Sequence, residues 1–370
     1  MTSVSRRQVL LGGGALLGAG LVPGVNFIGN AFGDEILRPD YIIRAATNEN
    51  PWGPSRVAIQ AINRSLHRSS TYGVNSAKLI RLVAGINDVL PDHVAVGTGS
   101  GEILKTAALI ATLERGSIVC ADPTYHDLTR YAEGVGVDVI RVPVDQGFGT
   151  DLDAMRKAIR TDTTCVYLVN PNNPIPSIIE KNALREFVLE ISRDRMVFVD
   201  EAYFEFVEDP NYATMMDLVR DGHQNIIVAR TASKIHGLAG LRIGFGFAHP
   251  DLIAEINHRK TGNINVLGLE AAYASYQDKE FQKFTLRKNK ESLAIVEGMH
   301  EELGHRYVKS NANFSFFETG RDVNKVRAAF LNEGIMVGRP FPPMLDWLRV
   351  SMAKPDEMRY FVQTYKRLYG

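Results

Sequence analysis

Five short segments of the chain combine reactive or polar side chains with residues typical of tight turns. They are residues 97–102, 122–125, 170–174, 200–203 and 233–242, and each follows an apolar run typical of a buried strand. Lys234 is the most unusual residue among them, because lysine is normally a solvated surface residue and this one lies on a turn of small residues. Ligands of parallel sheets bind beyond the carboxyl ends of the strands, so we expect the five segments to meet at one site.

Each segment alone also has an ordinary structural explanation. The glycine-rich turn at 97–101 lacks the last glycine of a dinucleotide fingerprint and the Gly-Lys-Ser/Thr of a P-loop, so it is also compatible with a plain tight turn. Tyr125 suits core packing, and the Asn-Pro-rich segment 170–174 suits a rigid turn. Asp200 is compatible with a capping or salt-bridge role, although a carboxylate at the end of a buried strand is costly unless it is paired.

One ligand accounts for all five segments together. A planar ring with a phosphate, an aldehyde, a phenolic oxygen and a pyridine nitrogen needs one partner for each group, and that ligand is pyridoxal phosphate. The glycine turn would bind the phosphate at a helix N-terminus. Tyr125 is predicted to stack on the ring, and Asp200 to contact its nitrogen. Asn173 and Tyr203 are predicted to contact the phenolic oxygen, and Lys234 to form a Schiff base with the aldehyde.

Alternating apolar runs and helical patterns between residues 94 and 247 must position these groups. Seven strands are predicted, at 94–96, 117–121, 137–142, 164–169, 196–199, 226–229 and 243–247, with helices between most of them, one of which runs from 123 to about 133. Before these strands, Ser55 is predicted to cap a helix. Such alternation is typical of an α/β domain with a mostly parallel sheet covered by helices on both faces. Beyond about residue 251 the pattern changes to long helical stretches and a few short strands, which predicts a small C-terminal α+β domain.

The expected division of the chain has four parts. Residues 1–33 form a signal peptide, 34–66 an arm and linking helix, 67–255 a large cofactor-binding domain, and 256–370 a small domain with a long connecting helix. The leader contains Arg6-Arg7, an apolar segment at 10–22 and small residues near 31–33, which are the parts of a twin-arginine export signal. We therefore expect a protein made in the cytoplasm and exported to the periplasm, without a stable membrane span.

Composition narrows the possible partners. The 370 residues include 42 Lys+Arg and 42 Asp+Glu, so the net charge is zero and no basic cluster suggests nucleic-acid binding. The two cysteines, Cys120 and Cys165, lie in apolar runs without the spacing of a metal site. They are expected in the core, with a disulfide between them left open if the protein is exported. The expected partners are small molecules.

The chain resembles fold-type I aminotransferases of class I/II, and within them the histidinol-phosphate aminotransferase group. The resemblance spans roughly residue 40 to the C-terminus. It rests on these segments: 48–54 (Asn-Glu-Asn-Pro-Trp-Gly-Pro), 71–72, 97–103, 123–125, 170–174, 200–203 (Asp-Glu-Ala-Tyr), 230–234 (Arg-Thr-Ala-Ser-Lys), 238–242 and 348–349.

The resemblance implies further site residues. It implies that the cofactor phosphate is bound by Gly99, Ser100, Gly101, Thr231, Ser233 and Arg242. Tyr72 would reach the same phosphate from the neighbouring subunit, so the active unit would be a homodimer. Arg349 would bind the substrate carboxylate or phosphate as a planar fork, with Arg339, Asn173 and Asn50 also at the substrate. Lys234, Asp200 and Tyr203 would carry the catalysis.

Three departures from the family pattern bear on the substrate. Ile175-Pro176 stands where Thr-Gly is usual, Tyr72 is followed by glycine where proline is usual, and residues 338–343 are not the generic sequence. The expected function is transamination between an amino acid, or an amino-alcohol phosphate such as histidinol phosphate, and a 2-oxo acid. The alternatives are decarboxylation of an amino-acid phosphate or β-elimination with the same cofactor, and a non-catalytic module that binds pyridoxal phosphate.

Overall fold

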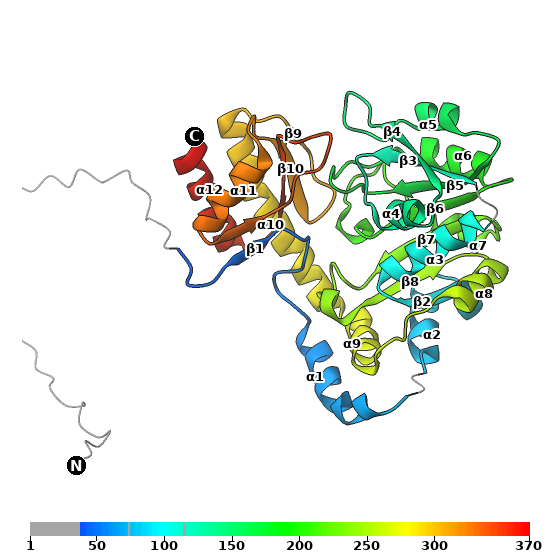
Figure 1. The fold of residues 1–370 in the computed structure, drawn as a ribbon. Coiled ribbons are helices and arrows are strands. Elements are labelled where there is room, and N and C mark those ends of the chain that lie inside the picture. Colours follow the sequence, from blue (N-terminus) through cyan, green and yellow to red (C-terminus); the bar gives the residue numbers. More distant parts are fainter. Residues whose placement is uncertain (1–37, 73–74, 114–115) are drawn as a thin grey trace, which may run out of the picture. The chain divides into compact units, whose positions relative to one another are not determined.

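The computed structural model describes residues 38–72, 75–113 and 116–370. The predicted leader lies outside this part of the chain. A seven-stranded sheet dominates it, with strand order β2-β8-β7-β6-β5-β3-β4 (Figure 1). The strands are β2 (Val94–Thr98), β3 (Ser117–Asp122), β4 (Asp138–Pro143), β5 (Thr163–Val169), β6 (Met196–Asp200), β7 (Ile226–Thr231) and β8 (Ile243–Phe247). The predicted α/β fold is confirmed.

Six of the seven strands run in the same direction. β3 pairs in parallel with β4 and β5, and β5, β6 and β7 are parallel in turn. β8 is antiparallel to both of its neighbours, β2 and β7. The carboxyl ends of β2, β3, β5, β6 and β7 therefore lie at one edge of the sheet, where β8 begins.

Helices cover both faces of the sheet because its strands are apolar on both sides. One face packs against α3 (Ser100–Thr112), α4 (Asp127–Gly134) and α8 (Pro250–Arg259), through a core that includes Ile103, Leu128 and Ile253. The other face packs against α2 (Ala77–Ile86), α5 (Leu152–Ala158), α6 (Lys181–Ile191), α7 (Met216–Arg220) and α9 (Val266–Gln277). The sheet is thus packed on both faces, which fixes the positions of the residues at its carboxyl edge.

The C-terminal part of the chain forms a second core. It contains the antiparallel sheet β12-β10-β9, built from β9 (Tyr307–Val308), β10 (Phe314–Glu318) and β12 (Trp347–Ser351), and the helices α10 (Lys279–Leu303), α11 (Val323–Asn332) and α12 (Pro355–Tyr369). Phe330, Phe361 and Tyr365 are fully buried in its apolar cluster. The predicted boundaries between domains stay a prediction.

The structure refines three local expectations. The arm is partly a strand, because β1 (Ile43–Ala45) pairs in parallel with β11 (Ile335–Val337). The helix predicted from residue 123 starts only at Asp127, and the Thr124 hydroxyl donates to Asn172 Oδ1 at 2.7 Å. The helical stretch after residue 251 is three helices, because Asn265 and Asp278 cap new N-termini. Before these, α1 (Arg56–Ser65) begins after Ser55, as predicted.

None of the helices in the described residues is both long and apolar enough to cross a membrane.

Candidate active site

A pocket of about 370 Å³ lies at the carboxyl edge of the large sheet. All five predicted segments contribute to it, together with residues from the arm and from the C-terminal part. The predicted site residues that line it are Ser100, Gly101, Tyr125, Asn173, Asp200, Tyr203, Thr231, Ser233, Lys234, Arg242, Arg339 and Arg349. The carboxyl ends of the strands thus bring together groups that are far apart in the sequence, as expected for a parallel sheet.

Lys234 lies on the turn that follows β7 and points into this pocket. Its Nζ donates to the backbone oxygen of Asn48 at 3.2 Å and lies 5.3 Å from the centre of the Tyr203 ring. Within the described residues the Lys234 amine makes no ion pair with a carboxylate. It is therefore available to react with a ligand in the pocket.

Asp200 ends β6 and is 2% exposed. One carboxylate oxygen, Oδ1, accepts a hydrogen bond from the Ala202 amide at 3.1 Å. Burial raises the pKa of Asp200 from its ordinary 3.8 to about 7, against the lowering effects of that hydrogen bond and of the Lys234 charge. A buried carboxylate with so little compensation is suited to a cationic ligand group.

The Tyr203 hydroxyl is held by two amides. Its oxygen accepts from Asn48 Nδ2 at 2.9 Å and from Asn173 Nδ2 at 3.3 Å, so its own hydrogen is free to donate to a ligand oxygen. Asn48 was not among the predicted site residues, although the segment that contains it was. Its Oδ1 accepts from Ser351 Oγ at 2.7 Å, which fixes the side chain, and its backbone is left-handed with φ 55°.

A further part of the site is suited to an anion. Gly99, with φ 81°, is the N-cap of the 13-residue helix α3, so the free amides of the first turn face the site. A Cβ at Gly99 would overlap the Arg242 guanidinium, which lies directly against this turn. Thr231 Oγ1 donates to Ser233 Oγ at 2.9 Å beside it. Amides, hydroxyls and a guanidinium together match a phosphate.

Arg349 on β12 approaches the pocket from the C-terminal part and is only 8% exposed. Its Nη1 donates to Asn173 Oδ1 and its Nη2 to the Ala46 oxygen, both at 2.6 Å. Its Nε is buried without a hydrogen-bond partner among the described residues. Arg339 is exposed at the rim of the pocket, and both guanidiniums contact the Phe341 ring, at 4.8 Å for Arg349 and 4.3 Å for Arg339 from the ring centre.

Three predicted residues do not line this pocket: Gly99, which is the N-cap of α3, Tyr72 and Asn50. Tyr72 is fully exposed and belongs to a separate surface hollow with Ser69 and Lys260. Asn50 is buried, but its Nδ2 donates to the Ile235 oxygen at 2.8 Å. The pocket also contains residues that the sequence did not single out: Thr47, Asn48, Glu49, Thr124, Val169, Ala202, Ala239 and Phe341. The arm residues among them, Thr47 to Glu49, lie directly before Asn50, so the pocket is lined by the predicted segment but not by Asn50 itself.

Comparison with known proteins decides the family. The family model for aminotransferase class I and II matches residues 42–364. The chain belongs to the class I and II aminotransferases. A histidinol-phosphate aminotransferase of Moorella thermoacetica is 36% identical over 298 residues, which cover 80% of this chain and 77% of that protein.

Solved structures agree with this family. A protein from Erwinia carotovora atroseptica, provisionally named a histidinol-phosphate aminotransferase, has a TM-score of 0.85 at 30% identity, covering 88% of this chain and 96% of that one. The histidinol-phosphate aminotransferase of Sinorhizobium meliloti, solved in complex with pyridoxal-5'-phosphate, has the same fold, with a TM-score of 0.81 at 24% identity over 89% of this chain and 92% of that one.

As a class I and II aminotransferase, the protein is an enzyme of transamination that uses pyridoxal phosphate. The predicted enzyme class and cofactor are confirmed. The pocket fits this cofactor on its own evidence, because its lining combines a site suited to a phosphate, the buried Asp200 carboxylate and the amine of Lys234. The roles predicted for single residues stay predictions.

The first testable prediction concerns the cost of keeping Asp200 buried. The folded pKa of about 7 exceeds the ordinary 3.8, so the wild-type protein without cofactor loses stability as the pH rises through this window. Asp200→Asn removes that loss. We expect the variant to be more stable than the wild type at pH 8, on the order of 2–4 kcal/mol in urea unfolding, with the difference shrinking toward pH 4.

Asp194→Asn, at a side chain that is 63% exposed, is the matched control and should change stability little at either pH. An Asp200→Asn variant that is no more stable than the wild type at pH 8 would show that the Asp200 carboxylate does not destabilise the folded protein.

Proposed function

We propose that this aminotransferase moves an amino group between an amino acid, or an amino-alcohol phosphate such as histidinol phosphate, and a 2-oxo acid. The observation that carries the proposal is Arg349, a buried guanidinium in the pocket with no carboxylate partner among the described residues. A buried charge of this kind calls for an anion. Carboxylates and phosphates both match the planar fork of arginine.

The names of its relatives support a phosphate-bearing amine as one substrate. The Moorella thermoacetica protein and a second relative from Hydrogenovibrio crunogenus, 34% identical over 88% of each chain, are both called histidinol-phosphate aminotransferases. Arg339 supports the same view, because burial and the nearby Arg130 and Arg327 lower its pKa. An anionic substrate group beside Arg339 would relieve this repulsion.

The residues divide the remaining work as follows. In our proposal the α3 turn at residues 99–101 binds the cofactor phosphate together with Thr231, Ser233 and Arg242. Tyr125 stacks on the ring, and Asn173 and the Tyr203 hydroxyl hold its phenolic oxygen. Asp200 keeps a proton on the ring nitrogen. These contacts fix the plane in which the substrate must bind.

Pyridoxal phosphate supplies an electron sink that stabilises negative charge at the substrate Cα. Lys234 Nζ then takes the proton from Cα and returns a proton during the second half of the exchange. The Asn48 oxygen, 3.2 Å from Nζ, orients the amine for this transfer. Arg349 and Asn173, linked by their 2.6 Å hydrogen bond, hold the anionic group of the substrate so that Cα faces Lys234.

Two of the departures from the family pattern meet at the wall of this pocket. Ile175 is fully buried and packs in one apolar cluster with Phe316, Phe341 and Trp347. Phe341 belongs to the unusual segment 338–343 and also lines the pocket. We propose that this cluster selects the substrate side chain, because it shapes the wall beside Arg349.

The second prediction tests Arg349 as the anion-binding group. Arg349→Gln should lower kcat/KM by about 30-fold or more for every donor that the wild type accepts, because loss of a buried charge-assisted contact costs about 2–5 kcal/mol. Donors are screened by the change in absorbance of the bound cofactor when donor alone is added. Release of carbon dioxide, or of ammonia with pyruvate, would instead favour the decarboxylase or the lyase alternative.

Arg359→Gln on α12, where the side chain is 46% exposed, is the control and should keep the wild-type kinetics. Wild-type KM values for all donors in Arg349→Gln would refute the proposed role.

We also propose that the enzyme is a homodimer in which Tyr72 reaches the cofactor phosphate of the partner subunit. The support is the complete exposure of Tyr72, which leaves it free to enter another copy. In a two-fold dimer the exchange is reciprocal, so each subunit completes the other's site.

The third prediction uses mixed dimers. Tyr72→Ala and Lys234→Ala should each be nearly inactive, but mixing them with subunit exchange should restore about a quarter of wild-type activity, since half of the dimers then hold one intact site. No recovery on mixing, or an active Tyr72→Ala homodimer, contradicts the crossing of Tyr72.

Finally, we propose that residues 1–33 direct export by the twin-arginine route, on the support of Arg6-Arg7 and the apolar segment after them. The fourth prediction is that Arg6→Lys combined with Arg7→Lys retains the protein in the cytoplasm, measured by cell fractionation, while the wild type is found in the periplasm. Equal distribution of the two proteins would exclude this route.

A further inference from the structure

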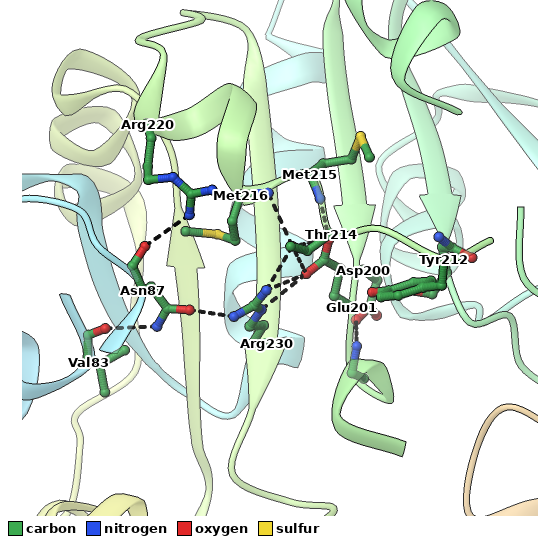
Figure 2. A network of polar contacts seen from close by, with 12 residues as sticks. Val83, Asn87, Asp200, Glu201, Tyr212, Thr214, Met215, Met216, Arg220 and Arg230 are labelled. Carbon is green, nitrogen blue, oxygen red and sulfur yellow. Dashed lines mark hydrogen bonds and ion pairs between the residues drawn. The ribbon is translucent and has the colours of Figure 1, made fainter. Parts of the chain in front are cut away.

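A buried ion pair joins the strands that carry Asp200 and Thr231 (Figure 2). Glu201 is 1% exposed and Arg230 7%. Arg230 donates to Glu201 Oε2 from Nη2 at 2.8 Å and from Nε at 3.1 Å. Burying two charges is costly, and a well-packed apolar pair is often at least as stable. Stability is therefore a weak explanation for this pair.

The pair lies directly behind the proposed cofactor contacts. Glu201 follows Asp200 in the chain, and Arg230 precedes Thr231. Asp200 is paired with Ala229 across β6 and β7, and the Glu201 amide donates to the Ala229 oxygen at 2.9 Å. Successive side chains of a strand point to opposite faces. Asp200 and Thr231 accordingly line the pocket, whereas their neighbours Glu201 and Arg230 do not.

Further contacts fix both members of the pair (Figure 2). Glu201 Oε1 accepts from the Met215 amide at 2.8 Å, and both carboxylate oxygens lie within 2.9 Å of the Thr214 hydroxyl. Arg230 donates from Nη1 to Asn87 Oδ1 and from Nη2 to Thr214 Oγ1. Its guanidinium also lies 3.6 Å from the centre of the Phe204 ring. The pair cannot move without disturbing several elements.

The charges around Asp200 show what the pair balances. Lys234, which lines the pocket, lowers the pKa of Asp200, whereas the carboxylates of Asp127 and Glu201 raise it. Glu205 also lies near Arg230 and Lys279; burial raises its pKa to about 8, and the two cations lower it. Arg230 forms its ion pair with Glu201 and so offsets the charge of that carboxylate.

We propose that Glu201 and Arg230 are positioning residues, which hold Asp200 and Thr231 in place across β6 and β7 and balance the charge behind the Asp200 carboxylate that meets the cofactor ring nitrogen. This inference rests on the proposed cofactor contacts of Asp200 and Thr231. It adds a second layer to the site, built from the residues that flank those contacts.

The fifth prediction follows from the sign of each charge. In the purified enzyme with bound pyridoxal phosphate, Glu201→Gln leaves a positive charge unbalanced and Arg230→Gln leaves a negative one. An added positive charge lowers the pKa of nearby groups, and an added negative charge raises it. The pH midpoint of the absorbance change of the bound cofactor should fall in Glu201→Gln and rise in Arg230→Gln, each by roughly 0.5–1 pH unit.

The double variant Glu201→Gln with Arg230→Gln should return near the wild-type midpoint. Glu208→Gln, which makes the same change in an exposed pair with Lys290, should not move it. A merely structural pair would shift both single variants in the same direction or not at all, and either result would overturn the proposal.

Arg230→Lys keeps the test decisive if the single glutamine variants do not fold. It retains the charge but loses the fork, so we expect an unchanged midpoint and about tenfold weaker binding of pyridoxal phosphate in equilibrium dialysis. Wild-type affinity would overturn the proposal. Asp200→Asn is measured alongside to separate two failures. If Asp200→Asn also binds pyridoxal phosphate with wild-type affinity, the proposed role of Asp200 is wrong. If Asp200→Asn binds it more weakly while Arg230→Lys does not, only the proposed role of the ion pair is wrong.

Discussion

The buried carboxylate of Asp200 is the constraint on which the site depends. Burial is the main reason why its pKa is raised to about 7, and only the Ala202 amide and the charge of Lys234 act in the opposite direction. Such a group is unfavourable in an empty pocket but favourable once a cationic ring nitrogen stands beside it. The buried carboxylate therefore lowers the stability of the protein without cofactor, and cofactor binding restores this stability. Such a loss of stability is common at functional sites.

The sheet topology explains how distant residues reach this carboxylate. Six strands share one direction, so the turns after them converge on one edge, and Arg242 lies at the same edge because it directly precedes the antiparallel β8, which starts there. The arm adds Asn48, and β12 adds Arg349. The pocket therefore needs both the rigid sheet and the C-terminal part, and Asn173 links the two through its bonds to Tyr203 and Arg349.

Much of this arrangement could be predicted because it depends on local signals. Buried strands are continuous apolar runs, and turn residues mark their ends, so the fold and the strand-end groups such as Lys234 followed from periodicity and spacing. The contacts of Asn48 could not be predicted in this way. They depend on a left-handed residue in an irregular arm, where no periodicity indicates which side chain points inward.

Contacts between distant segments could not be predicted from the sequence either. Ile175 and the segment 338–343 were both recognised as unusual, but nothing local indicated that Ile175 and Phe341 pack in one cluster. In the same way, Glu201 and Arg230 belong to the motifs that carried the family resemblance, yet their pairing became visible only once β6 and β7 were placed side by side.

The most direct test of the account is to identify the lysine that bonds the cofactor. Borohydride reduction of the purified enzyme fixes a carbon–nitrogen bond between pyridoxal phosphate and its lysine, and peptide mass spectrometry then locates the modified residue. The account predicts the cofactor mass on Lys234, in a peptide that contains the Thr231 to Ile235 stretch. Stoichiometric modification of any other lysine, with Lys234 unmodified, would contradict it.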